Sequence, residues 1–344
     1  MIIKVNKTDK DKILKLLQEK NMNICAAEDL FNYCFYSTQK RVTNFVEDIQ
    51  NYLDLDIKDA ENRYYFESRI KPAFKKLDNA DYDTDYYRRT IRPKPFKNNK
   101  YELTYLTFGP NHCFPYDDIE IKENYVELSK IGYFPKDYNY LAVLKNGVVW
   151  MSTDPNEINT MKQSIDEATG RVVAFGLGLG YFPIMAANKD TVSEVVVVEK
   201  DQTIIDIFKK HILPQFPKQN KIVIIHDDAF DYIKQLKCDY LFIDIWHNPE
   251  DGLPLYLRFK KVLKGESFKV SYWLEKSILS MYRRCLLTIV EEAFDGFDDN
   301  NYQKSENEYD EIINDLYYKT KNVVISSYED LMKILQDNEL KKLV

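Results

Sequence analysis

The stretch RVVAFGLGLGYFPIMAANKDTVSEVVVVEKD, residues 171–201, decides the fold of this chain. Its apolar run at 172–175 shows no helical periodicity, which predicts a strand buried on both faces. Gly176, Gly178 and Gly180 follow at alternate positions. Glycine permits positive φ and lets a ligand approach the backbone, because no Cβ stands in the way. The pattern therefore predicts a strand that runs into a ligand-binding turn.

A helix and a second strand complete the unit. The helix is predicted from Tyr181, and Pro183 suits its first turn because no helical donor is lost there. A second apolar run at 195–198 leads into Glu199, nineteen positions beyond Gly180. This is close to the spacing at which an acidic side chain binds the two hydroxyls of a nucleoside ribose. The unit is therefore interpreted as half of a nucleoside-cofactor site.

The spacing of the glycines narrows the class of cofactor. A dinucleotide turn needs G-x-G-x-x-G, and its third glycine would fall on Tyr181 or Pro183 in the two registers. The observed G-x-G-x-G turn, followed by a ribose-binding acid, resembles the class I S-adenosylmethionine-dependent methyltransferases and their relatives, the polyamine aminopropyltransferases. The resemblance covers roughly residues 145–264.

The resemblance also assigns residues after the second strand. Asp228 and Ala229 match the third-strand position that holds the adenine amino group, with Asp227 as the alternative, and Asp244 ends the fourth strand. One departure is that Ala174 and Phe175 replace the acidic residue common just before the first glycine. The resemblance implies S-adenosyl-L-methionine as cofactor, bound by Phe175, Gly176, Leu177, Gly178, Gly180, Glu199, Lys200, Asp228, Ala229 and Asp244.

The order of the predicted elements gives the fold class. Strands alternate with helices from 170 to 264, which predicts an α/β, Rossmann-like doubly wound and mostly parallel sheet. Residues 1–100 are predicted to be a helical accessory domain with a basic linker, and 101–160 a β-hairpin lead-in. Residues 161–344 are predicted to form the Rossmann-like methyltransferase domain with a helical C-terminal extension. Only one of the two further strands that normally close the family's sheet is recognisable.

Local patterns refine these segments. Residues 26–53 and 60–77 have apolar side chains at helical intervals, which predicts helices there. Asn146 and Gly147 predict a two-residue hairpin turn, since both tolerate positive φ. A helix follows, and Glu157 stands where a capping box places its carboxylate.

The loop at 244–251 is the best candidate for chemistry. Asp244, Trp246 and His247 follow a predicted strand end, where functional residues concentrate. Asp244 is expected to contact cofactor or substrate, and Trp246 to stack on substrate or shield the sulfonium. His247 is a candidate proton acceptor, although a lone loop histidine is more often structural.

The composition of the chain limits the kinds of function and site that remain possible. The 344 residues carry a net charge of −7, which argues against nonspecific coating of nucleic acid. Five scattered cysteines without C-x-x-C indicate reduced thiols, and the histidines have no metal-ligand spacing, so no metal is predicted. No apolar run reaches the length of a membrane span, and a cytoplasmic location is expected. The joint at 78–100 contains Arg88, Arg89 and Arg92, which suggest either RNA contact or, more simply, a solvated linker.

Three functions stay open on these observations. The first is a methyltransferase with an unidentified acceptor. The second is an aminopropyltransferase of the spermidine synthase type, because the loop from Asp244 resembles that family's D-x-x-D-P-x-G-P motif. Here, however, His247 and Asn248 precede the proline. The third is a non-catalytic nucleoside-binding module that binds a protein partner, and a homodimer stays open in every case.

Overall fold

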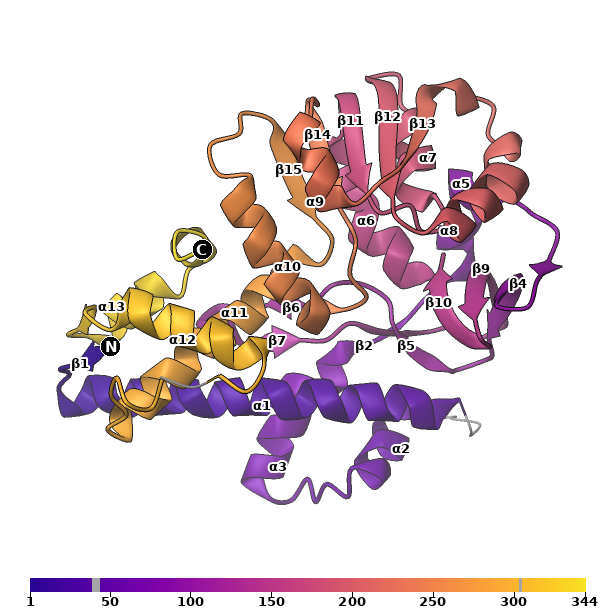
Figure 1. The fold of residues 1–344 in the computed structure, drawn as a ribbon. Helices are drawn as coiled ribbons and strands as arrows, with labels where there is room; N and C mark the ends of the chain where they lie inside the picture. The colour runs from indigo at the N-terminus through magenta and orange to yellow at the C-terminus, as the bar shows by residue number, and fades with distance from the viewer. Residues whose placement is uncertain (39–43, 303–304) are drawn as a thin grey trace.

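The central sheet has five parallel strands (Figure 1). The computed structural model describes residues 1–38, 44–302 and 305–344. Side chains 172–175 of the first strand are fully buried, as its continuous apolar run requires. The strand order is β13–β12–β11–β14–β15. The strands are β11 (Gly170–Phe175), β12 (Val192–Glu199), β13 (Ile222–His226), β14 (Tyr240–Ile243) and β15 (Lys269–Tyr272).

Helices cover both faces of this sheet, as Figure 1 shows. From β11 the sheet extends to β12 and β13 on one side and to β14 and β15 on the other, so the order of the strands reverses between β11 and β14. Ligands of doubly wound folds bind at such a point, beyond the carboxyl ends of the strands. The predicted Rossmann-like fold class is therefore confirmed. The helices around the sheet are α6 (Pro155–Glu167), α7 (Tyr181–Asn188), α8 (Gln202–Ile207), α9 (Ala229–Tyr232) and α10 (Pro249–Val262).

A four-stranded antiparallel sheet, of order β10–β9–β4–β3, stands before the parallel sheet. Asn146 and Gly147 have φ of 55° and 81°, so the predicted hairpin turn joins β9 to β10. Tyr101 donates a hydrogen bond to Asp201 and Trp150 to His247, so this sheet lies beside the segments that follow two strands of the parallel sheet, β12 and β14. Its strands are β3 (Phe96–Lys97), β4 (Tyr101–Phe108), β9 (Tyr138–Lys145) and β10 (Val148–Ser152).

The N-terminal helices differ from the prediction in one element. Pro72 has no amide hydrogen, so the predicted helix at 60–77 ends in a short turn, and β2 (Phe74–Lys76) follows in its place. Of the predicted helix at 26–53, residues 39–43 lie outside the described residues. The helices here are α1 (Lys7–Ser37), α2 (Phe45–Tyr52) and α3 (Ala60–Tyr65), the last continued by a π-turn at Phe66–Ile70.

The joint at 78–100 is more ordered than a solvated linker. Asp78 and Asp85 cap two short helices, α4 (Asn79–Asp83) and α5 (Tyr86–Thr90), by accepting amide hydrogen bonds. The part of the joint at 78–90 is therefore helical in two short segments, whereas residues 91–95, which include Pro93 and Pro95, have no helix or strand.

Segments predicted as separate also share a small sheet, in which β2 lies beside β8 (Ile131–Tyr133) and β8 beside β5 (Cys113–Pro115). The domain boundaries at 100 and 160 stay a prediction. Two further strands, β6 (Glu120–Ile121) and β7 (Glu127–Leu128), form a separate pair.

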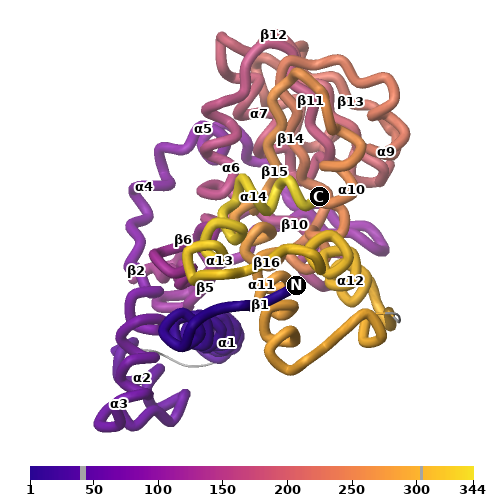
Figure 2. The backbone as a smooth tube through the Cα atoms, turned by 90° about the vertical axis from the view of Figure 1, so that its left-hand side faces the viewer, coloured from indigo at the N-terminus to yellow at the C-terminus, as the bar shows by residue number. Residues whose placement is uncertain are grey.

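The C-terminal segment packs back against the first helix. The short strand β16 (Val324–Ile325) pairs in parallel with β1 (Ile2–Ile3) and not with the central sheet. Figure 2 shows these two segments near each other, beside the N-terminus. Among the described residues the central sheet therefore keeps five strands. Within this part of the chain, no helix combines the length and the apolar character of a membrane crossing. The helices here are α11 (Glu275–Phe294), α12 (Glu308–Thr320), α13 (Tyr328–Ile334) and α14 (Asp337–Leu340).

Candidate functional site

The glycine turn after β11 contains two glycines that are closely packed against other residues and one that faces open space. Gly176, Gly178 and Gly180 have φ of 95°, 52° and 77°, a region that other residues rarely adopt. A Cβ on Gly176 would collide with the backbone oxygen of Asp244, and one on Gly180 with the ring of Phe208. A Cβ on Gly178 would meet nothing within 4 Å. Gly178 is therefore the position where a ligand can approach the backbone.

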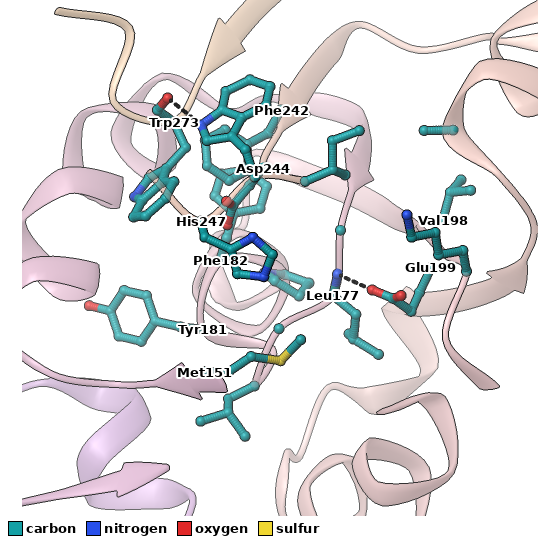
Figure 3. Close-up of a pocket in the computed structure, with 18 of the residues that line it drawn as sticks. Met151, Leu177, Tyr181, Phe182, Val198, Glu199, Phe242, Asp244, His247 and Trp273 are labelled. Atoms are coloured by element: carbon teal, nitrogen blue, oxygen red, sulfur yellow. Dashed lines mark hydrogen bonds between the residues drawn. The ribbon is translucent and has the colours of Figure 1, made fainter. Parts of the chain in front are cut away.

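Glu199, at the end of β12, is held by the same turn. Its carboxylate accepts the amide hydrogen of Leu177 at 3.0 Å and that of Asp201 at 2.7 Å. Figure 3 shows the Glu199 carboxylate directed at the Leu177 amide. A carboxylate has about four lone-pair positions, so two of them stay available to a ligand. The interaction fixes the acid next to the open side of the turn.

The carboxyl ends of β11, β12, β13 and β14 surround one cavity of about 450 Å³. Cavities of this size accommodate small-molecule ligands and cofactors. The side chain of Phe175 is instead fully buried in the core, and Gly180 also stands outside the lining. The sequence-predicted residues that line the cavity are Gly176, Leu177, Gly178, Glu199, Lys200, Asp228, Ala229, Asp244, Trp246 and His247.

The choice between Asp227 and Asp228 is not resolved by position, because both line the cavity. Asp228 caps α9 by accepting the amide hydrogen of Phe230 at 2.8 Å. Asp227 accepts the amide hydrogen of Asp228 at 2.9 Å. Each carboxylate keeps lone pairs that a ligand could use, so both stay candidates.

Asp244 lies where the cavity borders the central sheet. Burial, together with the nearby charge of Glu199, raises the pKa of Asp244 from its ordinary value of 3.8 to about 7. A carboxyl with this pKa changes charge near neutral pH and can either accept a proton or hold a cation. Strongly shifted groups in a cavity are candidates for functional residues.

Glu157, on α6, is a cavity residue that the sequence did not assign. Burial, the charge of Asp244 and then that of Asp154 raise the pKa of Glu157 well above its usual range. The expected capping box does not form, because Asp154 alone caps α6 and the Glu157 side chain lines the cavity. Asp244 and Glu157 therefore make one part of the cavity acidic.

His247 connects the loop after β14 to the antiparallel sheet. Its Nε2 accepts the indole hydrogen of Trp150 at 3.3 Å, because an indole nitrogen can only donate. Its Nδ1 then carries the ring proton and donates it to Asp251 at 2.9 Å. Both ring nitrogens are engaged, so proton transfer by His247 would first require breaking the Trp150 contact.

Aromatic side chains form much of the remaining wall. Trp246 is 5% exposed, packs flat over Gly252, and donates its indole hydrogen to the Trp273 carbonyl oxygen at 3.2 Å. Trp273 itself lines the cavity, as does Tyr181 (Figure 3). Aromatic faces attract cations, and a cavity that combines them with carboxylates favours positively charged groups. The sequence pointed to Trp246 but not to Trp150 or Trp273, which come from distant elements.

The cavity lining also includes cations. Among the described lining residues these are Lys200, which follows Glu199, and Arg258, whose guanidinium stacks on the ring of Phe230 at 3.6 Å. The lining thus combines these two cations with the carboxylates of Glu199, Asp244 and Glu157.

Comparison with known proteins gives partial structural likeness. No protein-family model matches the chain, and no curated protein matches it. The spermidine synthase of Thermotoga maritima is similar over 43% of this chain and 58% of its own, at 16% identity and a TM-score of 0.28. A spermidine synthase in complex with the transition-state analogue AdoDATO gives 15% identity over the same shares, with the same TM-score. A protein from Klebsiella pneumoniae, proposed to be an O-methyltransferase, is similar over 26% of this chain and 41% of its own, at 20% identity and a TM-score of 0.21.

This chain spans less than two thirds of each of these solved proteins. At these scores the likeness is limited to part of an α/β architecture. The Rossmann-like fold rests instead on the strand order of the central sheet and on its parallel pairings.

Proposed function

We propose that this chain transfers a carbon group from an S-adenosyl sulfonium donor, with methyl transfer from S-adenosyl-L-methionine as the leading candidate and its acceptor unidentified. The observation that carries the proposal is the single cavity at four strand ends, with Gly178 open to it and Glu199 fixed beside it. In this proposal Glu199 holds the ribose hydroxyls, and Asp228 or Asp227 holds the adenine amino group.

The donor would supply an already activated carbon, so the chain has mainly to align the acceptor and manage its proton. The new bond forms from the acceptor lone pair to that carbon as the carbon–sulfur bond breaks, and the electron pair of that bond stays on sulfur. Asp244 is the group placed to take the proton that the acceptor loses. A carboxyl with a pKa of about 7 suits that exchange at neutral pH.

Aminopropyl transfer is the second candidate, and the acidic part of the cavity favours it. The side arm of S-adenosylmethionine carries a carboxylate and an ammonium, whereas its decarboxylated form carries only the ammonium. A carboxylate beside Asp244 and Glu157 would disfavour their ionised forms further, whereas an ammonium would favour them, since like charges in a partly dry site destabilise each other. A polyamine acceptor would be favoured for the same reason.

The test is calorimetric titration of the purified chain with S-adenosylhomocysteine. We expect saturable binding that Glu199→Gln weakens by about tenfold or more, because it removes a charged acceptor of ligand hydroxyls. Glu194→Gln is the matched control, since Glu194 lies on the same strand, is paired with Arg171 and does not line the cavity. No binding, or equal losses in both variants, would contradict the proposal.

The two transfer reactions are then separated by their donors. Tighter binding of the decarboxylated donor than of S-adenosylmethionine, with turnover on putrescine, would favour aminopropyl transfer. The reverse order would favour methyl transfer. Binding of both donors without turnover on any acceptor would indicate the third reading, a nucleoside-binding module that acts through a protein partner.

A further inference from the structure

A second cavity, of about 500 Å³, lies beside α5, β4 and β9, elements that Figure 1 shows close together. Tyr87 borders it and donates its hydroxyl hydrogen to the Leu179 carbonyl oxygen at 2.5 Å. Leu179 lines the first cavity, so Tyr87 stands between the two. The second cavity is therefore a separate space next to the proposed donor site, and its lining is chemically different.

Two arginines give this cavity a positive charge. Arg88 and Arg92 line it, and its described lining residues include no aspartate or glutamate. Within the described ranges neither arginine forms an ion pair with a carboxylate. The nearby Asp85 is occupied, since it accepts the Arg88 amide hydrogen at 2.9 Å and the Tyr181 hydroxyl hydrogen at 2.8 Å. Two neighbouring arginines without a carboxylate partner are unusual in a chain of net charge −7, where carboxylates outnumber cations.

Arg88 is held in place yet incompletely satisfied. Its guanidinium stacks on the ring of Tyr138 at 4.4 Å, and its Nη1 donates to the Asn139 carbonyl oxygen at 3.0 Å. Its Nε is buried and has no hydrogen-bond partner in the described part of the chain. The ring of Tyr138 and the Asn139 carbonyl oxygen fix the guanidinium where Arg88 lines the cavity, so the group is preorganised for an acceptor there.

We propose that this cavity binds a phosphate monoester whose organic part is planar. Arginine presents several donors in a rigid fork that matches phosphate oxygens. Two arginines also match the charge of a phosphate monoester, which is between about −1.5 and −2 at pH 7. Tyr105, which lines the cavity and is 40% exposed, offers a ring on which a planar group can stack.

The test uses phenyl phosphate, which carries the phosphate and a planar ring but no adenosine. Calorimetry on the full chain should show saturable binding that Arg92→Ala weakens by about tenfold, as loss of one charge-assisted contact predicts. Arg92 is exposed, so its removal leaves the core intact. Arg89→Ala is the matched control, because Arg89 is exposed on α5 and does not line the cavity. It should leave the affinity unchanged.

A second variant tests the stacked residue without losing its charge. Arg88→Lys should also weaken phenyl phosphate, because an ammonium cannot reproduce the fork geometry. The proposal is overturned if phenyl phosphate does not saturate, or if Arg89→Ala weakens it as much as Arg92→Ala. It is also overturned if single-stranded RNA binds through these arginines while phenyl phosphate does not. Binding of S-adenosylhomocysteine is measured in parallel, so failure here is distinguishable from failure of the donor site.

Discussion

Replacing Asp244 by Asn should stabilise the protein, and the gain should grow with pH. The carboxyl ionises near 3.8 in the unfolded chain but near 7 in the folded protein, because burial and Glu199 disfavour its charge. At 1.36 kcal/mol per pKa unit, the full difference amounts to about 4 kcal/mol. Water in the cavity will lower that figure, so we expect about 2 to 4 kcal/mol at pH 8.

The direction follows from proton binding. Between these two pKa values the folded protein binds a proton that the unfolded chain has released. The stability contributed by protonated Asp244 is therefore fully present below pH 3.8 and is lost as pH rises through 7. Asn cannot ionise, so the variant should differ little from the wild type at pH 4 and should be more stable at pH 8.

The assay is urea unfolding of both proteins across pH 4 to 8, at constant ionic strength. Asp251→Asn is the matched control with the opposite sign. Burial alone would raise the pKa of Asp251, but hydrogen bonds from Asn248 and His247 lower it overall. The stability that ionised Asp251 contributes is lost only as pH falls below 3.8, so above about pH 5 that variant should be less stable than the wild type by a nearly constant amount. A difference between wild type and Asp244→Asn that stays constant with pH would refute the assignment of Asp244 as a desolvated carboxyl.

Two further substitutions, each with a matched control variant, test the glycine turn and a buried ion pair. Gly178→Ala should cost about 1 to 2 kcal/mol in unfolding free energy, because its φ is positive, and should weaken S-adenosylhomocysteine by more than about tenfold. Gly147→Ala, also at positive φ but at the hairpin tip, should cost a similar amount without affecting binding; equal binding by the two variants would contradict the role of Gly178. Arg69→Met should cost about 3 to 5 kcal/mol by leaving buried Glu19 unpaired, whereas Lys71→Met at an exposed pair should cost under about 1 kcal/mol. Similar urea midpoints for these last two variants would show that the Arg69 pair is not buried in solution.

The parallel sheet and its glycine turn were predictable because their signals are local. A buried strand needs a continuous apolar run, Gly176 marks where the Asp244 backbone crowds the turn, and Gly178 marks where the turn faces open space. The hairpin at Asn146 was predictable for the same reason, since its turn chemistry lies within two residues. The predicted elements here agree with the structure because each is specified by adjacent side chains.

Most of the residues and elements that the sequence did not predict depend on contacts between distant segments. Glu157 has a spacing that fits a capping box, and only the packing of α6 against the strand ends shows that its carboxylate points into the cavity. Trp150 and Trp273 come from elements far from the glycine turn, so no local pattern connects them to it. The helices of the joint did have a local signal, since Asp78 and Asp85 are good capping residues, but the charge run obscured it.

The electrostatics of the first cavity follow from the way distant elements of the chain meet there. Glu157 reaches the first cavity from α6, and Asp244 reaches it from the residue that follows β14. Their raised pKa values mean that the empty site resists a second negative charge, and that a bound cation would favour ionisation of both acids. Binding of a sulfonium or ammonium ligand near neutral pH would then cause these carboxyl groups to release a proton to solvent. The same two carboxylates that destabilise the folded chain at high pH would thereby give the site its preference for positively charged ligands.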